Sequence, residues 1–207
     1  MSGRVLFIAK SAVLPIFSSI LKQAVRLFTA LDLPADVLEN LRRLMESLRP
    51  TARIQWSPPA NLHITTKFIG YWPDQRLSEV MQVLSAIESR PRFRVHIREV
   101  GFFPNPHFPR VFWCGIEAAG MEALATATDR ATRSLGIASE TRAFSPHLTL
   151  ARIKERLDLQ PLRDAIRALP PRDFGSFEAD RFCLYQSQPQ RTGSVYTKLR
   201  EFPFSHT

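Results

Sequence analysis

Apolar and polar residues alternate along some segments of this chain and recur at helical spacing along others. Residues 25–31 form a β-rich apolar run, and residues 62–69 alternate as a half-buried strand does. Apolar side chains recur every three or four positions over 37–48 and again over 77–87, which predicts two helices. Alternation over 93–98 predicts a third strand, so the first half is predicted to run β-α-β-α-β.

The second half of the chain repeats this order. Its predicted elements are a strand over 111–116, a helix over 121–135, a strand over 147–153, a helix over 159–169, and strands over 181–186 and 195–199. The distances also match, because His63 follows Phe28 by 35 residues and His147 follows Trp113 by 34 residues. Two β-α-β-α-β units of similar length indicate an internal duplication and two related lobes.

Each half carries a His-x-Thr tripeptide at the same place in this order. The two segments are Asn61-Leu62-His63-Ile64-Thr65-Thr66 and Ser145-Pro146-His147-Leu148-Thr149-Leu150. Side chains two positions apart on a strand point to the same side. His63 and Thr65 are therefore expected to share one face. His147 and Thr149 are expected to share another.

Two copies of such a motif suit acid–base chemistry at phosphorus. Histidine titrates near neutral pH, so one neutral imidazole can deprotonate an attacking water while a second, protonated one delivers a proton to the leaving oxygen. In-line displacement places these groups on opposite sides of the phosphorus, as two lobes related by a pseudo-twofold axis would. The threonine hydroxyls can hold the non-bridging oxygens.

Composition and charge narrow the class of protein. The chain has 207 residues, of which 44% are apolar and 23% charged, which excludes a disordered chain, a collagen-like fibre and a disulfide-stapled miniprotein. Twenty-eight Lys and Arg against 19 Asp and Glu give a net charge of +9. This excess favours anionic partners such as nucleic acid, nucleotides or acidic lipid, and a merely solvated basic surface is an equal alternative.

Cysteine usage and ligand spacing give no sign of a metal. Cys114 and Cys183 are far apart and form neither a C-x-x-C motif nor a zinc-ligand spacing, so we expect two buried free thiols, which favours the cytoplasm. No H-x-x-x-H pair, acidic cluster beside the motifs or G-x-x-x-x-G-K-[ST] loop occurs in the sequence. We therefore expect neither a metal nor a cofactor.

The first two dozen residues differ from the rest of the chain. Residues 1–24 contain three basic residues and no acid, and their apolar stretch is broken by Lys10 and Pro15. A secretory signal needs an uninterrupted apolar region, so a poorly ordered extension or a start codon placed too early is preferred to a signal peptide. No charge-free run of 18 apolar residues occurs, so no membrane span is expected. A single bilobal domain is expected over 25–207.

The paired motifs and their flanks resemble the two-histidine (2H) phosphoesterases, and within them the LigT-like RNA 2′,3′-cyclic phosphodiesterases, also called 2′-5′ RNA ligases. The resemblance extends from about Val25 to Phe204. The segments that carry it are Arg26-Leu27-Phe28-Thr29-Ala30-Leu31-Asp32-Leu33-Pro34, Asn61-Leu62-His63-Ile64-Thr65-Thr66-Lys67-Phe68-Ile69-Gly70, Phe144-Ser145-Pro146-His147-Leu148-Thr149-Leu150-Ala151-Arg152 and Val195-Tyr196-Thr197.

This resemblance implies a fold, an activity and a site. The fold is α+β and bilobal, with duplicated β-α-β-α-β units whose two antiparallel sheets face a central cleft and whose helices lie outside. The activity is metal-independent opening of RNA 2′,3′-cyclic phosphate ends to 2′-phosphomonoesters, with reversible 2′-5′ ligation of tRNA halves in vitro. His63 would be the proton donor and His147 the proton acceptor. The residues expected to bind phosphate are Thr65, Thr149 and Arg152.

The sequence departs from the family pattern at Thr66, where an apolar residue is usual. By alternation Thr66 is expected to face the core at a small packing cost. Lys67 is expected on the side of His63, where it either touches the substrate or is solvated. For base stacking, Phe144 is preferred among several aromatic candidates, which also include Trp56, Phe102, Phe103 and Trp113.

Other functions stay open at this stage. The same two-histidine chemistry could act on a small nucleotide, such as a cyclic phosphate of ADP-ribose or a 2′-5′ oligoadenylate. A non-catalytic RNA-binding module is the alternative from another class, and the intact motifs argue against it. The basic strand face of Arg94, His96 and Arg98 is either solvated or tracks an RNA backbone. A monomer is expected, and two histidines in opposite protonation states predict a bell-shaped pH–rate profile.

Overall fold

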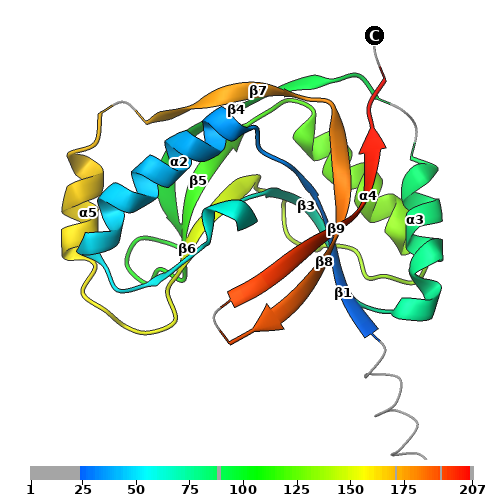
Figure 1. Cartoon of the computed structure of the whole chain (residues 1–207), viewed down its shortest axis with the longest axis horizontal. Coiled ribbons are helices and arrows are strands. Elements are labelled where there is room, and N and C mark those ends of the chain that lie inside the picture. The colour runs from blue at the N-terminus through cyan, green and yellow to red at the C-terminus, as the bar shows by residue number, and fades with distance from the viewer. Residues whose placement is uncertain (1–23, 88–89, 171, 192, 206–207) are drawn as a thin grey trace, which may run out of the picture.

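Two antiparallel sheets form the framework of the protein (Figure 1). The computed structural model describes residues 24–87, 90–170, 172–191 and 193–205. The first sheet contains, in spatial order, β3 (Ile64–Pro73), β1 (Ala24–Leu31), β8 (Arg181–Gln190) and β9 (Gly193–Pro203). The second contains β2 (Gln55–Trp56), β6 (His147–Arg152), β5 (Val111–Glu117), β4 (Phe93–Phe103) and β7 (Asp173–Ala179). The predicted α+β fold with two antiparallel sheets is confirmed.

Four α-helices connect these strands. They are α2 (Ala35–Leu48), α3 (Leu77–Ser85), α4 (Met121–Arg133) and α5 (Gln160–Arg167). Short 3₁₀ turns, η1 (Arg49–Thr51), η2 (Pro59–Asn61) and η3 (Asp74–Arg76), join some of them to the strands. All four helices were predicted from apolar spacing. The helix α2 begins directly after Pro34 and ends just before Pro50, as proline's missing N–H requires.

The two lobes do not coincide with the two halves of the sequence. β4 follows α3 in the first half of the chain, yet it pairs with β5 in the second sheet. Helix α2 likewise packs against β7 of the second sheet and against α5, whereas α4 packs against β3 of the first sheet and against α3. Each lobe therefore draws elements from both halves, which ties the lobes into one body.

The strands carry apolar side chains on one face and more exposed, polar side chains on the other. The helices cover the apolar outer faces of the sheets. On β4, Val95 and Ile97 are fully buried, whereas Arg94 and His96 on the opposite face are not. The buried apolar side chains from both sheets and all four helices form one continuous core. Cys114 and Cys183 are buried free thiols, as predicted.

Two strands were not predicted. β2 has only two residues and pairs with β6 through its backbone. β7 has the sequence DFGSFEA, whose Gly175 and short polar side chains weaken the alternating pattern. Gly175 has a φ of +113°, and this glycine lies in an irregular register opposite Ile97.

The predicted N-terminal extension over 1–24 lies, except for Ala24, outside the described residues. Ala24 is the first residue of β1 and pairs with Pro73 of β3. Among the residues that the structure describes, none of the helices combines the length and apolar character needed to cross a bilayer.

Candidate active site

A cleft of about 510 Å³ lies between the two sheets and brings both His-x-Thr motifs together. Its lining residues come from β1, β3, β8 and β9 of the first sheet and from β2, β5 and β6 of the second. The five residues predicted for the site, His63, Thr65, His147, Thr149 and Arg152, all line this cleft. Its volume is typical of a pocket for a small molecule or a nucleotide.

The first motif enters the cleft at the start of β3. The Nδ1 atom of His63 lies 2.7 Å from the carbonyl oxygen of Asn61, two residues earlier. The Asn61 amide in turn donates to the carbonyl of Ser194 on β9 at 2.6 Å, which fixes this turn against the neighbouring hairpin. The ring of His63 packs against Phe28 at 4.7 Å and edge-on against Tyr196 at 5.2 Å.

The second motif uses the same local device at the start of β6. The Nδ1 atom of His147 lies 2.8 Å from the carbonyl oxygen of Ser145, again two residues earlier. The hydroxyl of Ser57 donates to the carbonyl of Thr149 at 2.8 Å and ties this strand to β2. Around the ring of His147, one aromatic neighbour is found in the described structure, Phe103, at 5.1 Å and edge-on.

These two hydrogen bonds define what each imidazole can do. A backbone carbonyl only accepts, so Nδ1 must carry the proton in both His63 and His147. When the ring is neutral, its Nε2 is then an acceptor and a base. When the ring is protonated, Nε2–H is a donor and an acid. In both rings, which line the cleft, Nε2 is therefore the nitrogen that can gain or lose a proton.

A bulge in β3 reverses the alternation of side chains after the first motif. Thr65 and Lys67 lie opposite consecutive residues of β1, Ala30 and Thr29, so Thr66 has no cross-strand partner of its own. The hydroxyl of Thr66 is buried against that of Thr29, with 2.7 Å between the two oxygens. Thr66 faces the core as predicted, and this hydrogen bond offsets the expected packing cost.

The predicted position of Lys67 is wrong, because of this bulge. Lys67 lies on the face that α4 covers, away from His63, and it is 6% exposed. Its ammonium donates to Asp129 of α4 at 2.6 Å and to the carbonyl of Ala138 at 2.7 Å. It is neither solvated nor available to a substrate. The next residue, Phe68, takes the place in the cleft instead.

The same bulge in β6 brings Arg152 into the cleft. Thr149 and Ala151 lie opposite consecutive residues of β5, so Leu150 has no partner of its own. Strict alternation would place Ala151 on the side of His147 and Arg152 on the opposite side. With the bulge, Ala151 is buried and Arg152 is exposed along the cleft. Arg152 is thus the structural equivalent of Phe68 in the first motif.

Three of the predicted phosphate ligands are free to bind. The Thr65 hydroxyl, the Thr149 hydroxyl and the Arg152 guanidinium form no hydrogen bond or ion pair with other described residues. An unpaired guanidinium with two hydroxyls across a cleft is a donor set suited to a phosphate group.

The electrostatics of His63 follow from its surroundings. Burial lowers the pKa of His63 from its usual 6.5, and the positive charges of Arg152 and His147 act in the same direction. The Asn61 carbonyl and the carboxylate of Asp32 oppose this shift. The phosphate of a bound substrate would add a negative charge and raise the pKa again.

The aromatic candidates are distributed differently from the prediction. Phe144, the preferred stacking residue, packs against the core and does not line the cleft. Of the other candidates, Trp56 lines the cleft and Phe103 contacts His147. Sequence reasoning missed Phe28 and Phe68 as cleft residues. For Phe68, the bulge at Thr66 decides which side of β3 the ring faces.

Two of the three basic residues on this face of β4 are paired with acids. His96 lies 2.9 Å from Asp173 and Arg98 lies 3.3 Å from Glu117. Arg94 donates to the hydroxyl of Ser176. Because two of the three residues already have acidic partners, the net attraction of this face for an RNA backbone is reduced.

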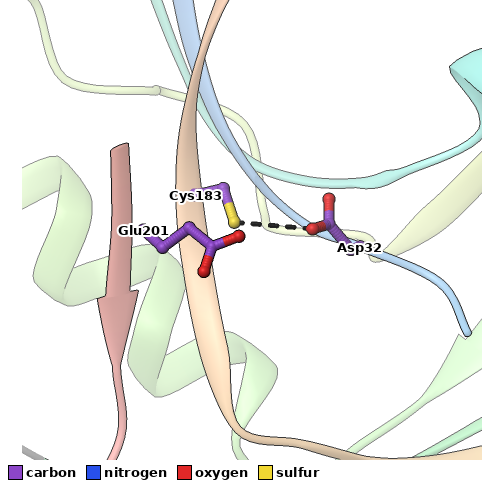
Figure 2. A group of neighbouring side chains, drawn as sticks. All are labelled: Asp32, Cys183 and Glu201. Atoms are coloured by element: carbon purple, nitrogen blue, oxygen red, sulfur yellow. Dashed lines mark hydrogen bonds between the residues drawn. The ribbon is translucent and has the colours of Figure 1, made fainter. Parts of the chain in front are cut away.

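A second polar cluster lies beside the cleft on the first sheet. Figure 2 shows Asp32, Cys183 and Glu201. The Cys183 Sγ atom and one carboxylate oxygen from each acid all lie within 4.8 Å of one another, close enough to be considered as ligands of a metal ion. The ammonium of Lys198 lies 2.6 Å from the Asp32 carboxylate and 2.8 Å from that of Glu201. The Tyr185 hydroxyl also donates to Asp32. Lys198 thus supplies the positive charge that these carboxylates need, and they act as its ion-pair partners.

The chain is similar in sequence to known phosphoesterases. The sequence profile of the family described as LigT like Phosphoesterase matches residues 31–113 and 116–196. An RNA 2′,3′-cyclic phosphodiesterase of Methanocaldococcus jannaschii is 30% identical, over 86% of this chain and 99% of the relative. One from Aeropyrum pernix is 34% identical, over 78% of this chain and 93% of the relative.

Solved structures show the same fold. TT0787 of Thermus thermophilus superposes with a TM-score of 0.74 at 30% identity, over 86% of this chain and 97% of that chain. Apo LigT of E. coli superposes with a TM-score of 0.73 at 24% identity, over 89% and 99% of the two chains. Two antiparallel sheets around a cleft match the 2H phosphoesterase fold of these structures. The chain belongs to the LigT-like phosphoesterase family.

Proposed function

We propose that this protein hydrolyses the 2′,3′-cyclic phosphate at the end of an RNA to a 2′-phosphomonoester. One observation carries the proposal: both histidines line one cleft with Nδ1 held by a carbonyl, beside an unpaired Arg152. The curated relatives named RNA 2′,3′-cyclic phosphodiesterase support the choice of substrate.

The proposed chemistry balances with two proton transfers. Nε2 of neutral His147 takes a proton from water as the water oxygen attacks phosphorus. Nε2–H of protonated His63 gives a proton to the 3′ oxygen as its bond to phosphorus breaks. Water is thereby added across one P–O bond, and the phosphate stays on the 2′ oxygen. Each positioned acid or base contributes about 10²–10⁴-fold.

Thr65, Thr149 and Arg152 are proposed to hold the phosphate during this reaction. Their free donors face a group whose non-bridging oxygens gain negative charge in the transition state. The site needs no metal in this scheme, because the two imidazoles supply both protons. The same groups would serve 2′-5′ ligation, in which the 5′ hydroxyl of a second RNA replaces water as the nucleophile at phosphorus and the 3′ oxygen again leaves with the proton from His63.

A small nucleotide substrate is the second candidate, and the size of the cleft favours it. A volume of about 510 Å³ holds a nucleotide without any further RNA. LigT of E. coli, which is 24% identical to this chain, has been crystallised with 3′-AMP. We propose a cytoplasmic monomer, and the two reduced, buried thiols support a reducing compartment.

The test uses a short RNA that ends in a 2′,3′-cyclic phosphate, incubated in the presence of EDTA. The product is identified by mass and by phosphatase and nuclease mapping. Wild type is expected to yield the 2′-phosphate, whereas His63→Ala and His147→Ala yield none above background. His96→Ala is the matched control, since His96 is paired with Asp173 outside the cleft.

A 3′-phosphate product or a requirement for metal would contradict the proposal. Turnover of a mononucleotide but of no RNA would favour the small-nucleotide candidate. RNA binding by wild type without any turnover would leave the non-catalytic module.

A further inference from the structure

A second groove, of about 270 Å³, adjoins the catalytic cleft at the end of β6. It lies between the loop that precedes β5 and the segment that joins β6 to α5. Arg110 lines this groove, and the next residue, Val111, lines the cleft. On the other side, Lys154 lines the cleft between two groove residues, Ile153 and Glu155. Cleft and groove therefore share a wall.

The shared wall is held by backbone hydrogen bonds. The N–H of Ile153 donates to the carbonyl of Arg110 at 2.9 Å. The guanidinium of Arg110 donates to the carbonyl of Lys154 at 3.2 Å. These bonds hold residues 153–154, directly after β6, against Arg110, directly before β5. The backbone that carries the side chains after Arg152 is therefore anchored to the second sheet.

Positive charge continues along this wall from the cleft into the groove. Arg152, Lys154 and Arg156 follow at every second position, and all three are exposed. Arg110 and Arg163 add two more cations at the groove. None of these five side chains has an acidic ion-pair partner among the described residues. Glu155 is the one acid among the groove's lining residues in the described structure.

This arrangement contrasts with the basic face of β4. There, Arg98 and His96 already face Glu117 and Asp173. Unpaired cations keep their attraction for an added anion, whereas paired ones must first lose their partners.

The groove also exposes apolar side chains. Phe108 is 65% exposed and Leu157 is 43% exposed, and both line the groove. The loop around Phe108 is ordered by the side chain of Asn105, which accepts from the N–H groups of His107 and Phe108 at 3.0 Å. An exposed aromatic ring among unpaired cations is the combination that binds single-stranded RNA, because bases stack on the ring while phosphates meet the charges.

We propose that this groove binds the single-stranded RNA that precedes the reacting cyclic phosphate. The inference rests on the proposed function, since it places the terminal phosphate beside Arg152. The preceding phosphates then lie along Lys154 and Arg156, and one base stacks on Phe108. The groove makes the enzyme prefer an RNA end over a mononucleotide.

The test compares adenosine 2′,3′-cyclic phosphate with an eight-nucleotide RNA that ends in the same group. Phe108→Ala and Arg156→Gln are each expected to lower kcat/KM for the RNA about five- to tenfold and to leave the mononucleotide within about twofold. Arg156→Gln should also reduce the slope of log affinity against log salt by about 0.7. Arg130→Gln and Tyr71→Ala are matched controls, because both side chains are exposed outside the groove.

A binding measurement separates this inference from the proposed function. Fluorescence anisotropy of the same RNA with a 2′-phosphate end needs no turnover, so it tests the groove even if the protein hydrolyses neither substrate. Equal losses on both substrates, or unchanged RNA binding in Phe108→Ala and Arg156→Gln, would overturn the proposal. A loss in Tyr71→Ala alone would also overturn it, because the RNA would then leave over β3.

Discussion

The two His-x-Thr motifs share one backbone design but stand in different surroundings. In both, a carbonyl two residues earlier holds Nδ1 of the histidine, and a bulge follows the threonine. His63, however, is packed between Phe28 and Tyr196, whereas His147 is more open and meets Phe103 edge-on. The duplicated backbone thus fixes where the two imidazoles point, and the flanking rings make the surroundings of the two imidazoles different.

The two motifs also differ at the position two residues after the bulge. Arg152 in the second motif is a cation that faces the cleft, and its equivalent in the first motif is Phe68, a ring that is 58% exposed. One motif thus presents a positive charge to the cleft and the other an apolar surface. An ancestral repeat with two identical halves could not bind an asymmetric substrate in one orientation, whereas these two halves can.

The largest effect is expected from a substrate that separates the acid from the base. With a normal cyclic phosphate, His63→Ala and His147→Ala should each lose about 10²–10⁴-fold in rate. If sulfur replaces the bridging 3′ oxygen, the leaving group needs no proton, so His63→Ala should recover most of its activity and His147→Ala should not. The rates are measured under single-turnover conditions. Recovery in His147→Ala instead would mean that the two roles are exchanged.

The next effect concerns the position after the bulge. Arg152→Gln should lower kcat/KM about 10- to 100-fold, because a hydrogen-bonded charge pair with phosphate is worth about 1.5–3 kcal/mol. Phe68→Ala, at the equivalent position, should cost less than about tenfold. Steady-state kinetics on the same RNA check both variants. Equal losses would show that the two motifs contribute the same kind of contact.

The ion pair behind the first motif should matter for stability and not for chemistry. Lys67→Met leaves Asp129 without its buried partner and should lower the free energy of unfolding by about 2 kcal/mol. Arg133→Gln is the matched control, since the exposed Arg133 bonds the same carboxylate and should cost less than about 1 kcal/mol. Urea unfolding measures both. A larger loss in Arg133→Gln would contradict this assignment.

The same pair predicts a pH dependence of stability. Burial acts to raise the pKa of Asp129, but hydrogen bonds from Lys67, the Glu140 N–H and Arg133 outweigh it and lower the pKa to about 2. Because the folded pKa is below the unfolded value, the contribution is present above about pH 4 and is lost as pH falls towards 2. Lys67→Met should make the free energy of unfolding fall less steeply between about pH 4 and pH 2. An unchanged pH dependence in this variant would contradict the role of the Lys67–Asp129 pair.

The smallest effect is expected on the titration of His63. Its pKa should lie below 6.5 in the free protein, because the ring is buried, and should rise when phosphate binds. Tyr196→Ala admits water to the ring and should raise the pKa by less than about one unit. Phe103→Ala, beside His147, should leave it in place. Proton NMR of the imidazole follows each titration, and a shift in Phe103→Ala would break the comparison.

Sequence reasoning found what depends on local periodicity and on the repeated motif. All four helices and most strands follow from apolar spacing, and four of the five site residues follow from the two His-x-Thr segments. The errors arise where a register shift decides the outcome. Alternation predicts Lys67 on the side of His63, because the bulge at Thr66 leaves no mark in an alternating pattern. Arg152 reaches the cleft through a matching bulge in β6. Alternation alone would place Arg152 on the opposite face, and the family resemblance was the reason to include it in the site.

Tertiary arrangement set the other limits. Nothing in the local pattern tells that β4 joins the second sheet, or that α2 and α4 each cover a sheet outside their own half. Phe144 adjoins the second motif in sequence, yet it packs against the core and does not line the cleft. Such placements depend on contacts between distant segments, which periodicity does not record.

The central claim is that the two motifs form one site, and a double-variant cycle tests it most directly. Single-turnover rates on an RNA with a cyclic phosphate end are compared for wild type, His63→Ala, His147→Ala and the double variant. Residues that act as a unit are strongly non-additive, so the double variant should be about as slow as the slower single variant. Losses that multiply in the double variant would show that the histidines act independently and would contradict the account.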